Sequence, residues 1–244
     1  MRTVCLVSHC WHYSRCLVYQ LSSLALFPPE KVRVVATVFY CEEDEPTVAA
    51  LQFFAEQEPF ASNRVVLNRC ALDRPLLLKR AIGRNWIAER TTADVVWWTD
   101  ADYLFRQGAL DSLADLDLEG PRLFFPRVTY FTRDRETGDA YADRARQPAI
   151  LDIDPADFIE HHPGKAIGGV QIVPGDVARA FGYCKDRWRH QNPAAADCVT
   201  FHRNWSDTAY RTILGDGKRI KGTPIEMPGV YRIRQTEFGV VDQR

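Results

Sequence analysis

Two aspartates separated by one residue, Asp100 and Asp102, have the type and spacing in this chain that most clearly point to chemistry. They follow the apolar run at residues 95–98, which is typical of a fully buried strand. Because burying charge inside such a run is costly, we expect the pair where the strand leaves the core. Residues two apart on an extended chain point the same way, so the two carboxylates face one side and suit Mg²⁺ or Mn²⁺ together with substrate phosphates. An ordinary acidic turn after a strand is the alternative that this pair alone leaves open.

Composition bounds the class of protein. The 244 residues are 46% hydrophobic and 26% charged with a formal net charge of −1, which is ordinary for a globular protein and gives no sign of a nucleic-acid or membrane partner. No apolar run reaches the length of a transmembrane segment, and the first fifteen residues read as a strand rather than a signal peptide. Seven cysteines without a repeated spacing favour a reduced, cytoplasmic protein.

The first hundred residues alternate between strands and helices. Strands are predicted at residues 3–8, 32–40 and 63–67, with helices at residues 15–27 and 46–57 between them. This alternation indicates an α/β fold with a mostly parallel central sheet flanked by helices. Open sheets of this kind bind ligands outside the carboxyl ends of their strands. We therefore expect the ligand near Ser8 and His9 after the first strand, and near Glu42 and Asp44 after the second, where a carboxylate can accept a hydrogen bond from the ligand.

A basic helix precedes the acidic pair. One helix is predicted over residues 74–93, opening near Pro75, with Arg80 and Arg84 four residues apart on one face. Gly83 lies beside them and lowers helix stability, which favours a position where another group approaches closely. A solvated basic face with a tolerated glycine is the alternative.

The second half is less regular. Strands are predicted at residues 123–131, 170–173 and 229–233, and helices at residues 176–183 and from residue 194. Residues 132–165 are dense in charge, so we expect a mobile loop with at most a short strand there, of the kind that forms active-site lids. The whole chain, residues 1–244, is expected to form a single domain, with a ligand-binding half at residues 1–105 and a second half at residues 106–244 that contains the loop.

Taken in order, the stretches RAIGRNWIAE, Asp100-Ala101-Asp102, IGGVQIVPGDV, ADCVTFHRNW and PGVYRIRQ resemble the family-2-like glycosyltransferases of the GT-A fold over most of the chain. The resemblance implies that the Asp-x-Asp motif binds the diphosphate of a nucleotide sugar through Mn²⁺ or Mg²⁺, with Asp102 in direct contact and Asp100 facing the metal or the ribose. It places Arg80, Gly83 and Arg84 near the nucleotide and Gly168-Gly169 on the acceptor side, and it implies that Asp197 is the catalytic base.

Two departures from the family pattern concern the base and the metal. Ala196 precedes Asp197 where the family often has a glutamate. Many members also carry a late histidine as a metal ligand, whereas this chain has no histidine after His202 and holds Arg234 and Gln235 in that neighbourhood. Weaker metal binding, or substitution of the ligand by Gln235 or a more distant group, are the interpretations that this leaves.

The function that this resemblance implies is a hexosyltransferase that moves a sugar from a nucleotide-sugar donor, a UDP-sugar by preference, to the hydroxyl of a glycan or another acceptor. An inverting transfer needs a carboxylate base, and Asp197 is the candidate. Three alternatives stay open: a nucleotidyltransferase on a similar sheet, a phosphatase that uses an Asp-x-Asp motif, and a catalytically silent protein that binds nucleotide sugars.

Overall fold

Strand β1 (Arg2–His9) lies near the middle of a seven-stranded sheet in the computed structural model. The structure describes the chain except for residues 61–63, 120–121, 165, 167–168, 184–221 and 236–244. Strands β1 to β4 are parallel, and β9 runs antiparallel to both β4 and β6. The seven strands in spatial order are β10 (Thr223–Ile225), β6 (Phe124–Pro126), β9 (Gln171–Pro174), β4 (Val95–Trp98), β1, β2 (Val32–Tyr40) and β3 (Val65–Ala71). The predicted mostly parallel central sheet is confirmed.

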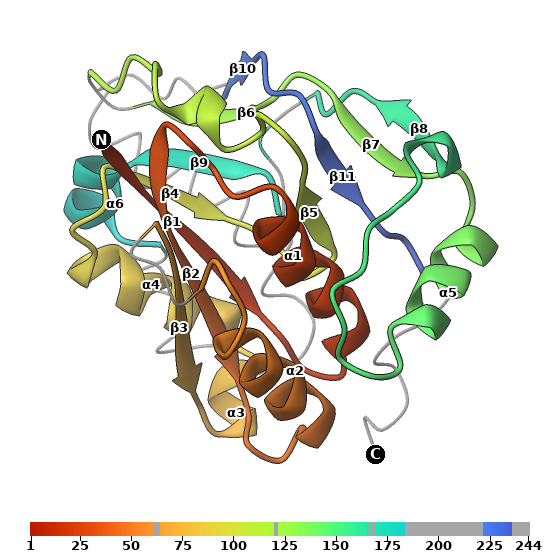
Figure 1. Cartoon of the computed structure of the whole chain (residues 1–244). Coiled ribbons are helices and arrows are strands. Elements are labelled where there is room, and N and C mark those ends of the chain that lie inside the picture. The colour runs from red at the N-terminus through yellow and green to blue at the C-terminus, as the bar shows by residue number, and fades with distance from the viewer. Residues whose placement is uncertain (61–63, 120–121, 165, 167–168, 184–221, 236–244) are drawn as a thin grey trace.

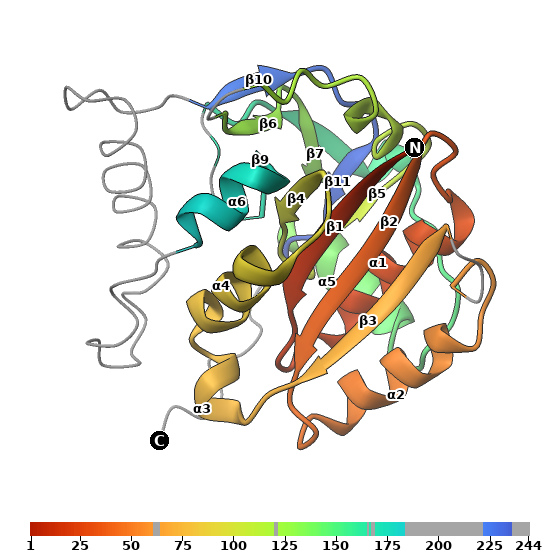
Figure 2. The ribbon, with the colours of Figure 1, turned by 90° about the vertical axis from the view of Figure 1, so that its left-hand side faces the viewer.

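Helices cover both faces of this sheet, as the parallel crossovers require. Helices α1 (Ser14–Leu26) and α2 (Glu45–Ala55) lie on one face, and α3 (Arg74–Leu77), α4 (Arg80–Arg90) and α6 (Gly175–Phe181) lie on the other (Figures 1 and 2). The single helix predicted over residues 74–93 is therefore two helices, with a break at residues 78–79. Among the described residues, no helix is both long enough and apolar enough to cross a membrane.

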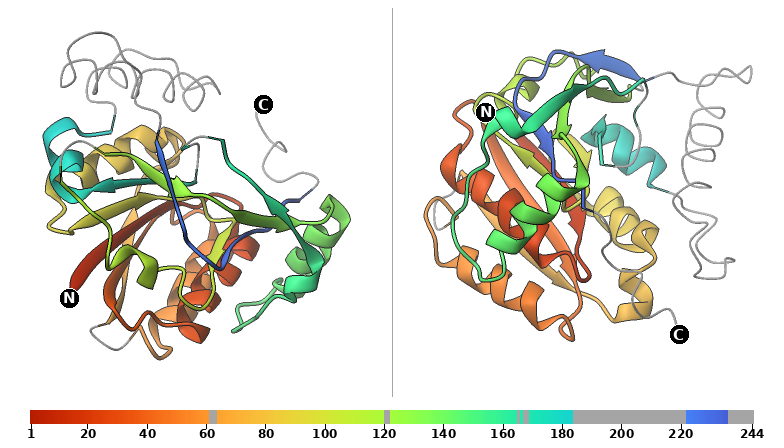
Figure 3. Two further views of the ribbon diagram at one scale, coloured as in Figure 1. Left: turned by 90° about the horizontal axis from the view of Figure 1, so that it is seen from above. Right: turned by 90° about the vertical axis from the view of Figure 1, so that its right-hand side faces the viewer.

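A second, four-stranded sheet packs beside the first. Its spatial order is β5 (Tyr103–Phe105), β11 (Val230–Arg232), β7 (Thr129–Thr132) and β8 (Phe158–His161). Helix α5 (Arg135–Arg144) lies against its β7 side (Figure 3), and two short 3-10 helices occupy residues 111–113 and 155–157. The acidic pair lies in the connection between β4 of the first sheet and β5 of the second. The turn that carries Asp100 and Asp102 therefore joins the two sheets.

Two expectations for the second half were wrong. Residues 123–131 form two strands in different sheets, because Pro126 has no backbone N–H for a continuing ladder. The segment 132–165 is not a loop with at most a short strand, because it contains the helix α5 in addition to the short strand β8. Asp134 caps α5 by accepting a hydrogen bond from the Thr137 amide at 2.7 Å, and Tyr141 of the same helix is buried. The mobility of this segment stays a prediction, and the helix expected from residue 194 lies outside the described residues.

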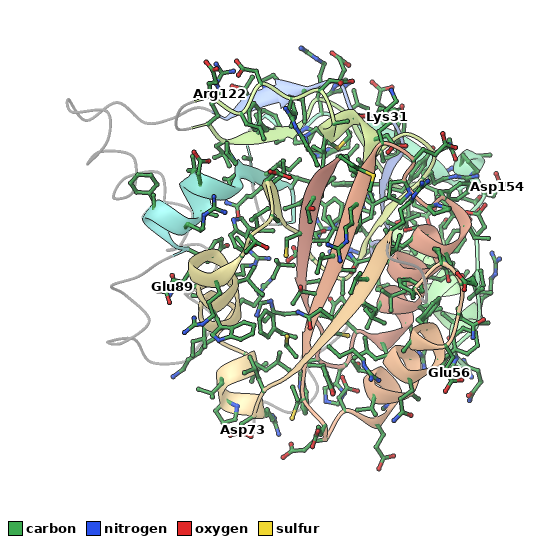
Figure 4. The ribbon with its side chains drawn as sticks, turned by 60° about the vertical axis from the view of Figure 1, so that its left-hand side comes forward. Lys31, Glu56, Asp73, Glu89, Arg122 and Asp154 are labelled. Carbon is green, nitrogen blue, oxygen red and sulfur yellow. The ribbon has the colours of Figure 1, made fainter. Side chains whose placement is uncertain are left out.

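The core follows the pattern of the strands. Every residue of β4 is buried, including Trp97 and Trp98, and α1 is buried on all sides from Cys16 to Leu24. The five cysteines of the described ranges are free thiols, and Cys70 alone among them is not buried. Six charged side chains at the rim point outward in Figure 4, namely Lys31, Glu56, Asp73, Glu89, Arg122 and Asp154.

Candidate active site

A cavity of about 370 Å³ lies where β1 and β4 end, at the carboxyl edge of the parallel sheet. This is the edge at which open α/β sheets bind ligands. The described residues around it combine aromatic, basic and acidic side chains; they are His9, Trp11, Tyr13, Leu77, Leu78, Arg80, Asp100, Ala101, Asp102 and Arg232. The acidic pair and Arg80 are thus brought together with His9, as the sequence predicts.

The loop after β1 supplies two aromatic walls, Trp11 and Tyr13. Asp44 fixes this loop, because its Oδ2 accepts hydrogen bonds from the His12 backbone N–H and from the Thr47 hydroxyl, each at 2.7 Å. The backbone of His12 has a φ of 57°, a left-handed conformation that suits a tight loop. Asp44 is buried, and Glu42 is exposed. Neither appears among the described residues that line the cavity, so Asp44 positions the loop.

His9 closes the end of β1 next to the buried Ser8. Its imidazole stacks on Phe39, with 4.8 Å between the ring centroids. Gly83 of α4 makes room for this ring, since a Cβ there would lie 2.5 Å from His9 Nε2 and 2.9 Å from Phe39. The close approach expected at Gly83 is therefore made by His9 and Phe39. Burial and the nearby guanidinium groups of α4 lower the pKa of His9 well below its usual range, so the ring is neutral at pH 7.

Asp100 is held by both arginines of α4. Arg80 donates to its Oδ1 at 2.9 Å and Arg84 donates to the same oxygen at 3.1 Å. Burial by itself would raise the pKa of Asp100, but Arg80, Arg84 and Arg232 outweigh it and lower that pKa, so the carboxylate is ionised at neutral pH. The prediction that Arg80 and Arg84 share one face is confirmed, and that face is turned to the acidic turn.

Arg84 is a structural anchor as well as an ion-pair partner. Its side chain is 3% exposed, while that of Arg80 is 44% exposed. Besides Asp100, Arg84 donates to the backbone oxygen of Thr99 at 3.1 Å and to the hydroxyl of Tyr183. These bonds tie α4 to the end of β4, so the position of the Asp-x-Asp turn depends on this buried guanidinium.

Two further contacts fix the turn from its other sides. The buried Gln20 of α1 donates to the backbone oxygens of Asp100 and Tyr103, each at 2.9 Å. Gly169 packs against the turn, because a Cβ there would lie 2.5 Å from the Tyr103 ring and 2.8 Å from the Asp100 amide nitrogen. Gly169 also accepts a hydrogen bond from the indole of Trp97 at 2.9 Å. The turn is therefore rigidly placed by both of its neighbouring layers.

Asp102 is paired with Arg232, which the sequence did not single out. Strand β11 runs antiparallel to β5 with Arg232 opposite Tyr103, and Arg232 Nε donates to Asp102 Oδ2 at 2.8 Å. Burial and the neighbouring Asp100 raise the pKa of Asp102 in spite of this guanidinium. Burial would lower the pKa of Arg232, but Asp102 and Tyr103 outweigh it and raise that pKa, so the guanidinium stays charged.

Several predicted residues lie elsewhere. Gly168 and Asp197 are outside the described residues. Arg234 turns away from the cavity and donates to the Thr132 backbone oxygen at 2.9 Å. The residues that sequence reasoning missed are Trp11, Tyr13, Gln20 and Arg232. The stretch YRIRQ contains both Arg232 and Arg234, and the sequence alone does not show which of them reaches the acidic pair. The strand register does, because it places Arg232 opposite Tyr103.

Guanidinium groups occupy an oxygen atom of each carboxylate of the acidic pair. Asp100 Oδ1 receives two guanidinium groups and Asp102 Oδ2 receives a third. Asp102 Oδ1 is buried without a hydrogen-bond partner, which leaves one carboxylate oxygen that is closed to solvent. No group of three or more His, Cys, Asp and Glu side chains that could hold a metal occurs in the part of the chain that the structure describes. In this arrangement a Mg²⁺ or Mn²⁺ ion at the acidic pair would lie beside three guanidinium groups, and this repulsion makes the described residues, as they are arranged, a poor fit for the ion.

Comparison with known proteins shows the fold. The sequence matches no protein-family model and no curated protein. The structure is similar to residues 1–349 of S. aureus TarS in complex with UDP-GlcNAc, with a TM-score of 0.55 and 12% identity over 98% of this chain and 60% of that one. A second TarS structure gives a TM-score of 0.52 and 13% identity over 95% of this chain and 36% of that one. A mannosyltransferase from Pyrobaculum calidifontis in complex with GDP-Man and Mn²⁺ gives a TM-score of 0.49 and 16% identity over 94% of this chain and 56% of that one.

The chain thus spans about 36–60% of the length of the TarS structures it resembles. Mixed α/β architecture, a seven-stranded and mostly parallel central sheet and helices on both faces are shared with these glycosyltransferases. The predicted glycosyltransferase fold of the GT-A type is the fold of this chain.

Proposed function

We propose that this chain is a glycosyltransferase that transfers a hexosyl group from a nucleotide-sugar donor, a UDP-sugar by preference, to an acceptor hydroxyl of a glycan or another molecule. The observation that carries the proposal is the cavity at the carboxyl edge of the sheet, where Trp11 and Tyr13 stand beside Arg80, Arg232 and the acidic pair. Aromatic walls suit a nucleoside, and guanidinium groups suit a diphosphate. The glycosyltransferase fold around this cavity supports the same reading.

Different residues of the cavity bind the nucleoside and the diphosphate of the donor. Trp11, Tyr13 and the neutral His9 surround the nucleoside at the end of β1. Arg80 and Arg232 face the diphosphate, where negative charge develops as the sugar leaves. Asp100 and Asp102 hold these two guanidinium groups at 2.9 and 2.8 Å and so orient them toward the cavity.

The transfer itself is a single displacement with inversion. The acceptor oxygen forms a bond to the anomeric carbon while the bond from that carbon to the diphosphate oxygen breaks, and the electron pair leaves with the nucleoside diphosphate. The acceptor proton passes to a carboxylate base, for which we propose Asp197, and we propose that Gly168 and Gly169 help to bind the acceptor. The general base contributes about a hundredfold to ten-thousandfold in rate.

Donor binding and turnover test this function. Thermal unfolding is measured with UDP, GDP, CMP and dTDP, because a ligand that binds the native state raises the apparent stability. Release of free UDP or GDP from a panel of nucleotide sugars is then followed with acceptor hydroxyl compounds present. We expect UDP to stabilise the protein and UDP-sugars to be turned over. Binding without release indicates a silent nucleotide-sugar-binding protein, and no stabilisation by any nucleotide refutes the proposal.

The role of the base is tested separately with Asp197→Asn. We expect this variant to bind UDP as the wild type does and to lose about a hundredfold to ten-thousandfold in transfer rate. The anomeric configuration of the product is read by NMR and should be inverted. A retained configuration, or normal turnover by Asp197→Asn, removes Asp197 from the mechanism.

A further inference from the structure

We propose that the guanidinium group of Arg232 takes the place that a divalent cation would hold at the Asp-x-Asp turn, so that this chain binds its nucleoside diphosphate without metal. The inference rests on the proposed function and concerns how the diphosphate of the donor is recognised. It starts from the misfit between the acidic pair and a divalent cation described above.

The position of Arg232 is set by strand register. Strand β11 pairs with β5, and Arg232 lies directly opposite Tyr103, the residue after the acidic pair. The backbone N–H of Ile233 donates to the Asp102 backbone oxygen at 3.0 Å, which fixes the same register at the turn. Arg232 is thereby held against Asp102, and about a third of its side chain stays exposed at the cavity that it lines.

Two aromatic rings fix the guanidinium group. Arg232 Cζ lies 5.1 Å from the ring centroid of Tyr103 and 5.5 Å from that of Phe131, distances at which a cation is attracted to the ring face. Together with the hydrogen bond to Asp102, these contacts leave the guanidinium little freedom. A positive charge that is already fixed needs no reorganisation when the leaving diphosphate gains charge.

The charges of the site favour an anion. Three guanidinium groups, those of Arg80, Arg84 and Arg232, stand against the two carboxylates, and His9 is neutral. The described site therefore carries one net positive charge before any ligand binds. A divalent cation at Asp102 would stand beside Arg232 and the two guanidinium groups of α4, which costs Coulomb energy. A diphosphate instead finds planar donors that match its oxygens.

The test measures the affinity of UDP by calorimetry, with GDP as a second probe, in EDTA and in millimolar Mn²⁺. We expect the wild-type protein to bind with the same affinity in both. Arg232→Gln should bind about tenfold to a hundredfold more weakly in EDTA, since it loses a charge-assisted contact to phosphate. Because it also frees Asp102, part of that affinity should return with Mn²⁺.

Arg234→Gln is the matched control, because it removes the same charge two residues further along the chain. The Arg234 side chain donates to the Thr132 backbone oxygen, so this variant should bind UDP as the wild type does. Where Arg232→Gln fails to fold, Asp102→Asn/Arg232→Gln removes both partners and should bind weakly with or without Mn²⁺. Wild-type binding that disappears in EDTA overturns this inference and leaves the proposed function standing, as does unchanged affinity in Arg232→Gln. No binding of UDP or GDP in either buffer overturns both.

Discussion

Arg80 and Arg84 bind the same oxygen of Asp100 from adjacent turns of α4, yet they should differ widely in their effect on stability. Arg80 Nη1 lies 2.9 Å and Arg84 Nη2 lies 3.1 Å from Asp100 Oδ1. The side chain of Arg84 is 3% exposed, against 44% for Arg80. Distance alone would therefore rank Arg80 slightly higher, whereas burial ranks Arg84 far higher.

The magnitudes follow from what each truncation leaves behind. An exposed ion pair contributes about 0–1 kcal/mol, because water and salt screen it, so Arg80→Ala should cost no more than that. Arg84→Ala leaves buried acceptors at Thr99 and Tyr183 in addition to a partly buried carboxylate. Breaking a buried pair from one side costs about 3–5 kcal/mol, and since Arg80 still holds Asp100 we expect the lower end, about 3 kcal/mol.

Both variants are compared with the wild type by urea unfolding and by thermal melting at one protein concentration. A loss of about 3 kcal/mol should lower the melting temperature by roughly 6–12 °C for a chain of this size. Arg84→Lys keeps the charge without the planar fork and should fall between Arg84→Ala and the wild type. An equal cost for Arg80→Ala and Arg84→Ala, or a cost below about 1 kcal/mol for Arg84→Ala, refutes the reasoning from burial.

Two further predictions concern the walls of the cavity. The pKa of His9 is lowered in the folded state, so below about pH 6.5 the unfolded chain takes up a proton at His9 that the folded chain does not. The free energy of unfolding therefore falls as the pH is lowered below about 6.5, by up to about 1.4 kcal/mol per pH unit. The unfolding free energy of His9→Gln should therefore fall less between pH 7 and pH 5 than that of the wild type. An equal fall in both proteins contradicts the prediction. Gly169→Ala should cost about 1–3 kcal/mol, because its Cβ meets the Tyr103 ring at 2.5 Å and a backbone nitrogen at 2.8 Å. Gly164→Ala, with no atom within 4 Å of its Cβ, is the control and should be neutral in the same urea titration.

The fold was predictable where a local pattern decides the structure. The strand ending in Trp98 and the valine-rich strand at residues 32–40 are recognisable because a buried parallel strand is apolar throughout. Helix α5 was missed because its sequence is dense in charge, and its signal is a cap at Asp134 and one buried face around Tyr141. A short amphipathic helix of this kind gains its stability from packing, which local composition does not reveal.

The site was predictable in its location and less so in its partners. Strand ends placed His9 and the acidic pair at one edge, because carboxyl ends of parallel strands meet there, and the family resemblance placed Arg80 near the same ligand. The partner of Asp102 was not predictable, since Arg232 is 130 positions away and reaches it through a strand pairing that no local signal specifies. The role of Gln20 was not predictable for a similar reason, because no local pattern in an apolar helix indicates that a glutamine donates a hydrogen bond to a distant turn.

The way in which the two sheets meet explains how Arg232 reaches the acidic pair. The turn at residues 99–102 leaves the first sheet at β4 and enters the second at β5, so any strand that pairs with β5 runs beside the acidic pair. Strand β11 does so in a register that brings Arg232 to Asp102. A substitution at that strand position therefore changes the charge beside Asp102, while the contacts of α4 with Asp100 come from another element. The affinity of Arg232→Gln for UDP, measured in EDTA and in Mn²⁺, therefore reports on the side chain at position 232 and not on the fold around it.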